Sequence, residues 1–180
     1  GEIVGVVAGD PIVAHRRGVE LAKKVYGVKV PAKAEIVLTD AYPHDVDMWQ
    51  AVKGIYAAEL VVKKGGTIIL CAPCPEGVSG EHPALLEYGY IPTDKVEELM
   101  RLGKIDDLVG ASDCARVGEL LKEVRIVLYS KISKGDTLKL NFEYAETPQE
   151  AVDEALARYG SDTRILVLRN AGDMVPMVSE

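Results

Sequence analysis

Gln50 and Lys53 are the two side chains whose types and spacing point most directly to chemistry. They stand three residues apart in a stretch, residues 48–63, that has the pattern of a helix starting after Asp45 or Asp47. Residues three apart share one face of a helix, and the N–H groups and dipole of a first helical turn favour an anion. An ammonium and an amide placed there suit a carboxylate with an adjacent hydroxyl. The plain alternative is a pair of surface side chains, which are common on helices.

Histidines and cysteines are the remaining candidates for acid–base, redox or metal chemistry. His44 and His82 fall in predicted loops, where either could transfer a proton. Cys71 and Cys74 have the spacing of a redox C-x-x-C motif. Such a motif opens a helix, whereas proline and glycine residues follow Cys74 and predict a loop. Without a second C-x-x-C, the sequence favours buried or loop cysteines over a metal site.

The elements that would position these residues alternate between strands and helices. Short apolar, β-branched runs predict strands at residues 3–8, 34–39, 67–72, 125–129, 142–145 and 164–168. Capping residues and glycines predict helices at residues 11–26, 48–63 and 147–160, with two or three short helices over residues 82–122. This alternation predicts parallel strands joined by right-handed crossovers. We therefore expect residues 1–180 to form a single α/β domain, a three-layer open, mostly parallel sheet with helices on both faces.

Ligands of such a sheet bind beyond the carboxyl ends of its strands. The loops expected there are residues 9–11, 40–47, 73–82, 129–135 and 169–176. Tyr42, His44 and His82 lie in two of these loops, so we predict them at the rim of any site.

Composition excludes several classes of function. The formal net charge is −7 and the basic residues are scattered, which disfavours nucleic acid or an anionic membrane as a partner. No apolar run approaches the roughly 20 residues that span a bilayer, and we see no signal peptide. Three cysteines in a chain of this length fit a reducing compartment, so we expect a cytoplasmic protein. The first residue is glycine rather than methionine, which predicts a domain cut from a longer chain.

Three segments in the same order resemble the C-terminal domain of the nickel-pincer lactate racemase family: residues 6–11, 42–54 and 65–81. The most specific piece is aromatic-Gln-Ala-x-Lys-Gly at residues 49–54. The resemblance implies a racemase or epimerase that interconverts the stereoisomers of a lactate-like 2-hydroxy acid by hydride transfer with a nickel-pincer nucleotide. It implies that Gln50 and Lys53 bind the substrate, with Lys53 pairing the carboxylate, and that Trp49 replaces the usual tyrosine as a wall of the pocket.

The resemblance also implies a partner domain. The family's proton-transfer histidines, cofactor-bearing lysine and nickel-coordinating histidine lie in an N-terminal domain, and nothing in this sequence matches that domain. We therefore expect a substrate-side, C-terminal domain that has no catalytic residue or metal ligand of its own, binds no cofactor alone and is inactive in isolation. Two alternatives stay open: a non-catalytic binding or regulatory module that kept only the fold, and a small nucleotide-binding α/β enzyme.

Overall fold

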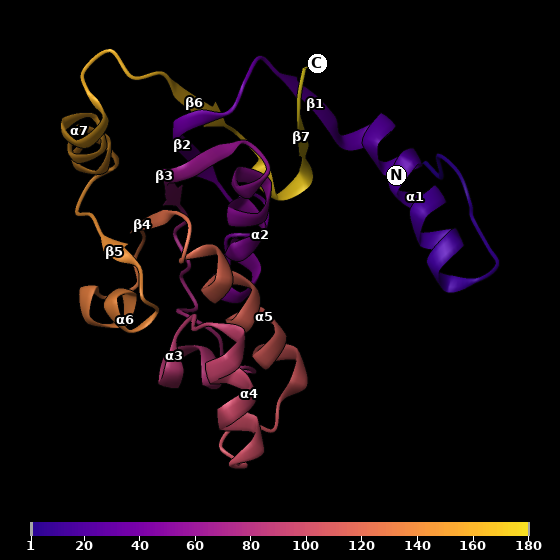
Figure 1. Cartoon of the computed structure of the whole chain (residues 1–180), viewed down its shortest axis with the longest axis horizontal. Helices are drawn as coiled ribbons and strands as arrows, with labels where there is room; N and C mark the ends of the chain where they lie inside the picture. The colour runs from indigo at the N-terminus through magenta and orange to yellow at the C-terminus, as the bar shows by residue number, and fades with distance from the viewer. Residues whose placement is uncertain (1, 180) are drawn as a thin grey trace.

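A five-stranded parallel sheet forms the centre of the molecule (Figure 1). The computed structural model describes residues 2–179. In spatial order the strands are β5 (Glu143–Tyr144), β4 (Arg125–Tyr129), β3 (Val62–Cys71), β2 (Ala34–Asp40) and β6 (Ile165–Leu168). All four pairings are parallel. The predicted class, an open parallel sheet, is confirmed.

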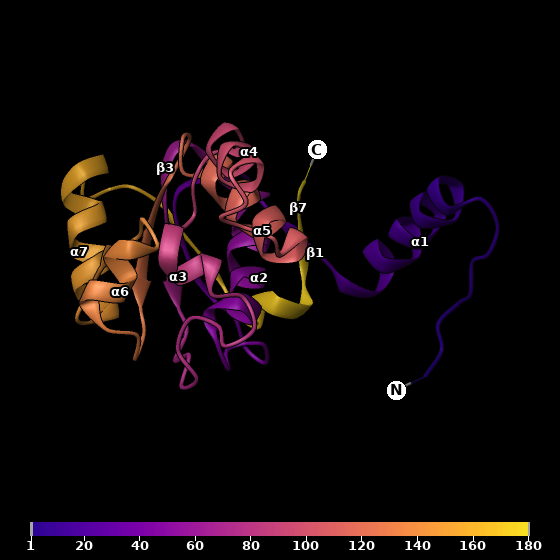
Figure 2. The same cartoon turned by 90° about the horizontal axis from the view of Figure 1, so that it is seen from below.

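Helices cover both faces of this sheet, so the molecule has three layers (Figure 2). One face packs on α7 (Pro148–Tyr159) through a small core that includes Ile36, Ile69 and Ala155. The larger core lies on the opposite face, where α2 (Met48–Glu59) is the central helix. The layer around α2 continues into α3 (Ala84–Tyr88), α4 (Thr93–Arg101), α5 (Leu108–Leu120) and α6 (Lys134–Lys139).

The strand predicted at residues 3–8 is wrong. These residues are exposed and have no regular secondary structure, although α1 (Pro11–Tyr26) does begin where expected, with Asp10 as its N-cap. A strand needs a partner, and residues 3–8 pair with no strand of either sheet in the described residues. Helix α1 buries no residue and extends away from the sheet (Figure 1). Residues 9–11 therefore do not belong to the rim of the sheet.

The remaining differences are two extra strands, one shifted boundary, and two short helices that the sequence pattern does not predict, α6 and a 3-10 helix. β1 (Gly27–Val30) and β7 (Val175–Val178) pair in a separate two-stranded parallel sheet that the sequence pattern does not predict. Strand β3 starts at Val62 rather than at residue 67, which ends α2 at Glu59 instead of residue 63. Residues 63–66 are lysines and glycines, which do not have the apolar pattern of a strand. Strand β3 nevertheless includes them, because Val62 already pairs with Ala34 of β2. A short 3-10 helix, η1 (Ala171–Asp173), follows β6.

Helix α2 lies against the carboxyl end of β2 because Gly54 has no side chain. A Cβ atom at this position would stand 2.4 Å from the backbone carbonyl oxygen of Asp40. The buried residues Ala51, Ile55 and Ala58 continue the contact along the helix. This close approach determines where the first turns of α2 sit relative to the strand ends.

We predict that Gly54→Ala destabilises the fold by about 1–3 kcal/mol, the usual range for overpacking a tight contact. The added methyl group would meet backbone, which cannot rotate away as a side chain could. Urea denaturation measures the difference in unfolding free energy. Gly135→Ala is the control, because a Cβ there meets only the Ser133 hydroxyl at 3.8 Å. Equal stabilities of the two variants would contradict the prediction.

Candidate functional site

The N-terminus of α2 is closed by other parts of the chain. The Asp47 carboxylate accepts a hydrogen bond from the backbone N–H of Gln50 (2.8 Å). The N–H groups of Met48 and Trp49 donate to backbone carbonyls of the loop 73–82, each at 3.0 Å. The amides of this turn are therefore already bonded within the chain. An anion near α2 has to be bound by side chains.

A chain of four polar side chains lies just beyond the strand ends. The Lys53 ammonium donates to the Gln50 amide oxygen over 2.6 Å and lies 3.2 Å from Nδ1 of His44. Nε2 of His44 lies 2.9 Å from Oδ1 of Asp173. The four residues come from α2, from the loop after β2 and from η1 after β6. The structure thus brings together three residues singled out from the sequence, Gln50, Lys53 and His44.

Asp173 completes this chain and was missed by the sequence analysis. It lies in the predicted rim loop 169–176, but 129 residues separate it from His44. The only available signal was that parallel strands deliver their following loops to one edge of the sheet.

A pocket of about 560 Å³ opens beside Gln50 and Lys53, between α2 and α5. Trp49 and Val52 of α2 contribute apolar surface to it. Its other lining residues are Tyr56, Leu108, Val109, Ser112, Asp113 and Arg116. The site predicted from residue spacing therefore has a concave surface with a cation and an amide beside it.

Trp49 is held in the wall of the pocket by His82. The two rings lie with their centroids 4.0 Å apart, and Nδ1 of His82 is 2.5 Å from a carboxylate oxygen of Asp107, the N-cap of α5. This hydrogen bond is the main reason that the pKa of Asp107 is lowered. His82 thus contacts Trp49 and Asp107 rather than the polar chain of His44, and neither His82 nor the exposed Tyr42 is part of the pocket lining.

A partly buried hydrogen bond between two lining residues of the pocket joins α2 to α5. The Tyr56 hydroxyl donates to Oδ1 of Asp113, while Oδ2 of Asp113 has no hydrogen-bond partner among residues 2–179. Burial raises the pKa of Asp113, and burial together with Asp113 raises the pKa of Tyr56. The Arg116 guanidinium lies 4.4 Å above the Tyr56 ring. None of these three residues was singled out from the sequence, because their pairing joins separate helices.

The cysteines are unlike redox cysteines. Cys71, Cys74 and Cys114 are all free thiols. Burial raises the pKa of Cys71 to about 11 and that of Cys74 to about 12, which keeps both protonated near neutral pH. Within residues 2–179, no group of three or more His, Cys, Asp or Glu side chains is arranged to hold a metal ion. Nor does any helix in that range have the length and apolarity to cross a membrane.

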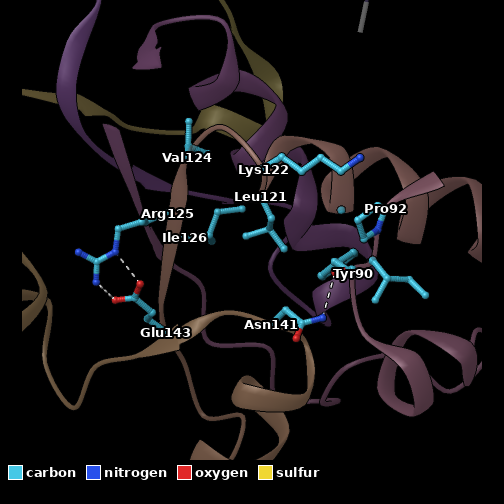
Figure 3. A pocket seen from close by; sticks show the side chains of 11 residues that line it. Tyr90, Pro92, Leu121, Lys122, Val124, Arg125, Ile126, Asn141 and Glu143 are labelled. Carbon is cyan, nitrogen blue, oxygen red and sulfur yellow. Dashed lines mark hydrogen bonds and ion pairs between the residues drawn. The ribbon is translucent and has the colours of Figure 1, made fainter. Parts of the chain in front are cut away.

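A second pocket, of about 400 Å³, lies at the other end of the domain between β4 and α5 (Figure 3). Its charged groups are already paired, since Arg125 forms an ion pair with Glu143 and Lys122 forms one with Glu119. The Asn141 amide donates to the Tyr90 carbonyl over 3.0 Å. These polar groups serve the packing of the sheet edge, so the pocket beside Lys53 is the better candidate site.

The fold and the site together define a parallel-sheet α/β domain that presents a lysine and a glutamine beyond its strand ends. The chain belongs to the family described as the lactate racemase C-terminal domain, whose model matches residues 29–175. The resemblance seen in the sequence is thereby confirmed.

Two curated lactate racemases are similar to this chain. The protein from Lactiplantibacillus plantarum is 31% identical over 176 residues, covering 93% of this chain and 40% of the relative. The protein from Thermoanaerobacterium thermosaccharolyticum is 28% identical over 161 residues, covering 86% of this chain and 36% of the relative. The chain thus spans about 40% of the length of these relatives.

Solved structures share the fold. The lactate racemase apoprotein from T. thermosaccharolyticum matches with a TM-score of 0.71 at 24% identity, covering 93% of this chain and 40% of that one. A protein from Thermotoga maritima matches with a TM-score of 0.61 at 18% identity, covering 93% and 42%.

Replacing Asp113 by asparagine should remove a pH dependence of stability. Because burial raises the pKa of Asp113 above 3.8, the folded state holds its proton more tightly than the unfolded state does. The contribution of Asp113 to the stability of the parent therefore falls as pH rises from the unfolded toward the folded pKa of this carboxyl group. The unfolding free energy of Asp113→Asn minus that of the parent should rise over this interval and then level off.

Urea denaturation of both proteins between about pH 4 and pH 7 measures this difference. Asp106→Asn, at an exposed carboxylate of the preceding loop, controls for the loss of one negative charge. A difference that stays flat, or that falls with pH, would show that Asp113 does not titrate as its burial requires.

Proposed function

We propose that this chain is the substrate-side domain of a racemase or epimerase that interconverts stereoisomers of a lactate-like 2-hydroxy acid. Membership of the lactate racemase C-terminal domain family supports the reaction class. The single observation that carries the proposal is the ammonium of Lys53, which lies beside the Gln50 amide at the mouth of a pocket. We further propose that the complete protein is cytoplasmic and has an N-terminal domain that closes over this site.

The side chains of Lys53 and Gln50 match the carboxylate and the hydroxyl group of a 2-hydroxy acid. Lys53 supplies a positive charge for the carboxylate. The Gln50 side chain accepts from Lys53 through its oxygen, which leaves its NH₂ group to donate to a carboxylate or hydroxyl oxygen of the substrate. Trp49 and Val52 offer apolar contact to the carbon skeleton and exclude water from it. Each group has a role in holding the acid, and none of them needs to take its proton.

The residues of this chain do not fit a nickel-pincer nucleotide. His44 uses both ring nitrogens for contacts to Lys53 and Asp173, and Nδ1 of His82 contacts Asp107. The Lys53 ammonium contacts Gln50 and His44, which leaves one N–H donor for an anion and no lone pair for a metal ion. In our proposal the cofactor and the hydride transfer therefore belong to the N-terminal domain, and this chain contributes substrate binding alone.

Lys53→Met should lower kcat/KM for the interconversion of D- and L-lactate, or of the related hydroxy acid that the complete protein accepts. Methionine keeps the length of the side chain but removes the charged hydrogen bond, worth about 1.5–3 kcal/mol, which corresponds to about a 10- to 150-fold loss. Circular dichroism or optical rotation follows the reaction. The matched control is Lys95→Met, which removes an exposed lysine of α4 that pairs only with Glu98. Equal kinetics in the two variants would refute the role of Lys53.

The isolated chain should show no hydroxy-acid racemase activity, even when the cofactor is supplied, because His44 is bonded to Lys53 and Asp173, and His82 is bonded to Asp107. Chiral chromatography of lactate after prolonged incubation tests this, with the complete protein as the positive control. Turnover comparable to that of the complete protein would show that the chemistry resides in this chain and would overturn the division of roles.

A further inference from the structure

We propose that His44, held by Asp173, is a positioning residue that directs the ammonium of Lys53 toward the substrate carboxylate. The inference rests on the proposed function of Lys53 and extends it to a pair of side chains in two loops. Its basis is that Lys53 has three N–H donors, whereas a neutral His44 ring has one N–H group and one acceptor nitrogen.

Lys53 has three N–H donors and no acceptor. One donates to the Gln50 amide oxygen at 2.6 Å, and a second points at Nδ1 of His44 at 3.2 Å. Because Gln50 and His44 hold two of the three N–H groups of Lys53, one N–H donor remains and its direction is defined. An ammonium on a flexible four-carbon chain otherwise loses conformational entropy when it binds an anion. The His44 contact removes part of that cost before the substrate arrives.

His44 can accept from Lys53 only in one tautomer. A neutral imidazole has one N–H and one acceptor nitrogen, and the partner of one nitrogen decides the state of the other. Nε2 of His44 faces Oδ1 of Asp173 at 2.9 Å, and an ionised carboxylate is an acceptor only. The proton is therefore assigned to Nε2, which leaves the lone pair of Nδ1 for the ammonium.

The backbone around Asp173 is built to bring this carboxylate to the ring. The backbone N–H of Ala171 donates to the Asp40 carboxylate at 3.1 Å, which ties η1 to the end of β2. Gly172 faces the ring so closely that a Cβ there would lie 2.6 Å from Cδ2 of His44. Two loops that follow neighbouring strands thus meet at the imidazole, with no room for a side chain between them.

The matched pair His44→Gln and His44→Asn separates the two nitrogens of the ring. The amide of asparagine reaches the place of Nδ1 and can accept from Lys53, whereas that of glutamine reaches the place of Nε2 and can meet only Asp173. In the complete protein, His44→Gln should raise KM about five- to tenfold, the effect of losing about one hydrogen bond, with kcat within about twofold. His44→Asn should recover most of that loss. A KM for His44→Gln equal to the parent value, or no recovery in His44→Asn, would overturn the inference.

A second measurement needs no activity and therefore separates this inference from the proposed function. Nitrogen-15 NMR of the 180-residue chain should show His44 protonated at Nε2 and unprotonated at Nδ1. Asp173→Ala should turn this into a mixture of tautomers. A proton on Nδ1 in the parent chain would overturn the inference even if Lys53 binds the substrate. The expected tautomer together with unchanged kinetics in Lys53→Met would instead remove the proposed function, and with it the purpose of the positioning.

Discussion

The contact between helix α2 and the end of strand β2 is the constraint on which the site depends. At Gly54 the helix backbone lies where any side chain would strike the carbonyl oxygen of Asp40. The same Asp40 uses its carboxylate to hold the backbone of Ala171. One residue at the tip of β2 thus fixes both α2, with Gln50 and Lys53, and η1, with Asp173. Small shifts of this strand end would move every polar group of the site together.

The closure of the α2 N-terminus decides what kind of recognition the site can perform. Many α/β domains bind anions through free amides of a helix N-terminus, but here Asp47 and the loop 73–82 take those amides. In our proposal, recognition of the substrate charge is therefore transferred to Lys53, one turn further along α2. A side-chain ammonium can be aimed by its neighbours, whereas backbone amides are fixed by the helix. The hydrogen-bonded chain through His44 is the consequence of that transfer.

Local patterns in the sequence predicted the parts of the structure that depend on local physics. The spacing of Gln50 and Lys53, the capping of α2 by Asp47 and the alternation of strands and helices each follow from a few neighbouring residues. The contacts of Asp173 with His44 and of Tyr56 with Asp113 join residues that are far apart in the chain. The β-branched run of residues 3–8 looked like a strand, but in the described residues it pairs with no other strand. Long-range partners decide such cases, and no local pattern contains them.

The arrangement of hydrogen bonds also bears on where the reaction of the proposed enzyme takes place. In this chain the groups near Lys53 that could exchange a proton are already bonded: His44 at both nitrogens, and His82 to Asp107 behind Trp49. Because these groups already have hydrogen-bond partners within the domain, the domain can hold the acid without exchanging a proton with it. In our proposal the carbon that inverts must therefore face away from α2, toward the N-terminal domain. Binding and chemistry then belong to opposite walls of one site, and the acid is exposed to the reacting wall only when the two domains meet.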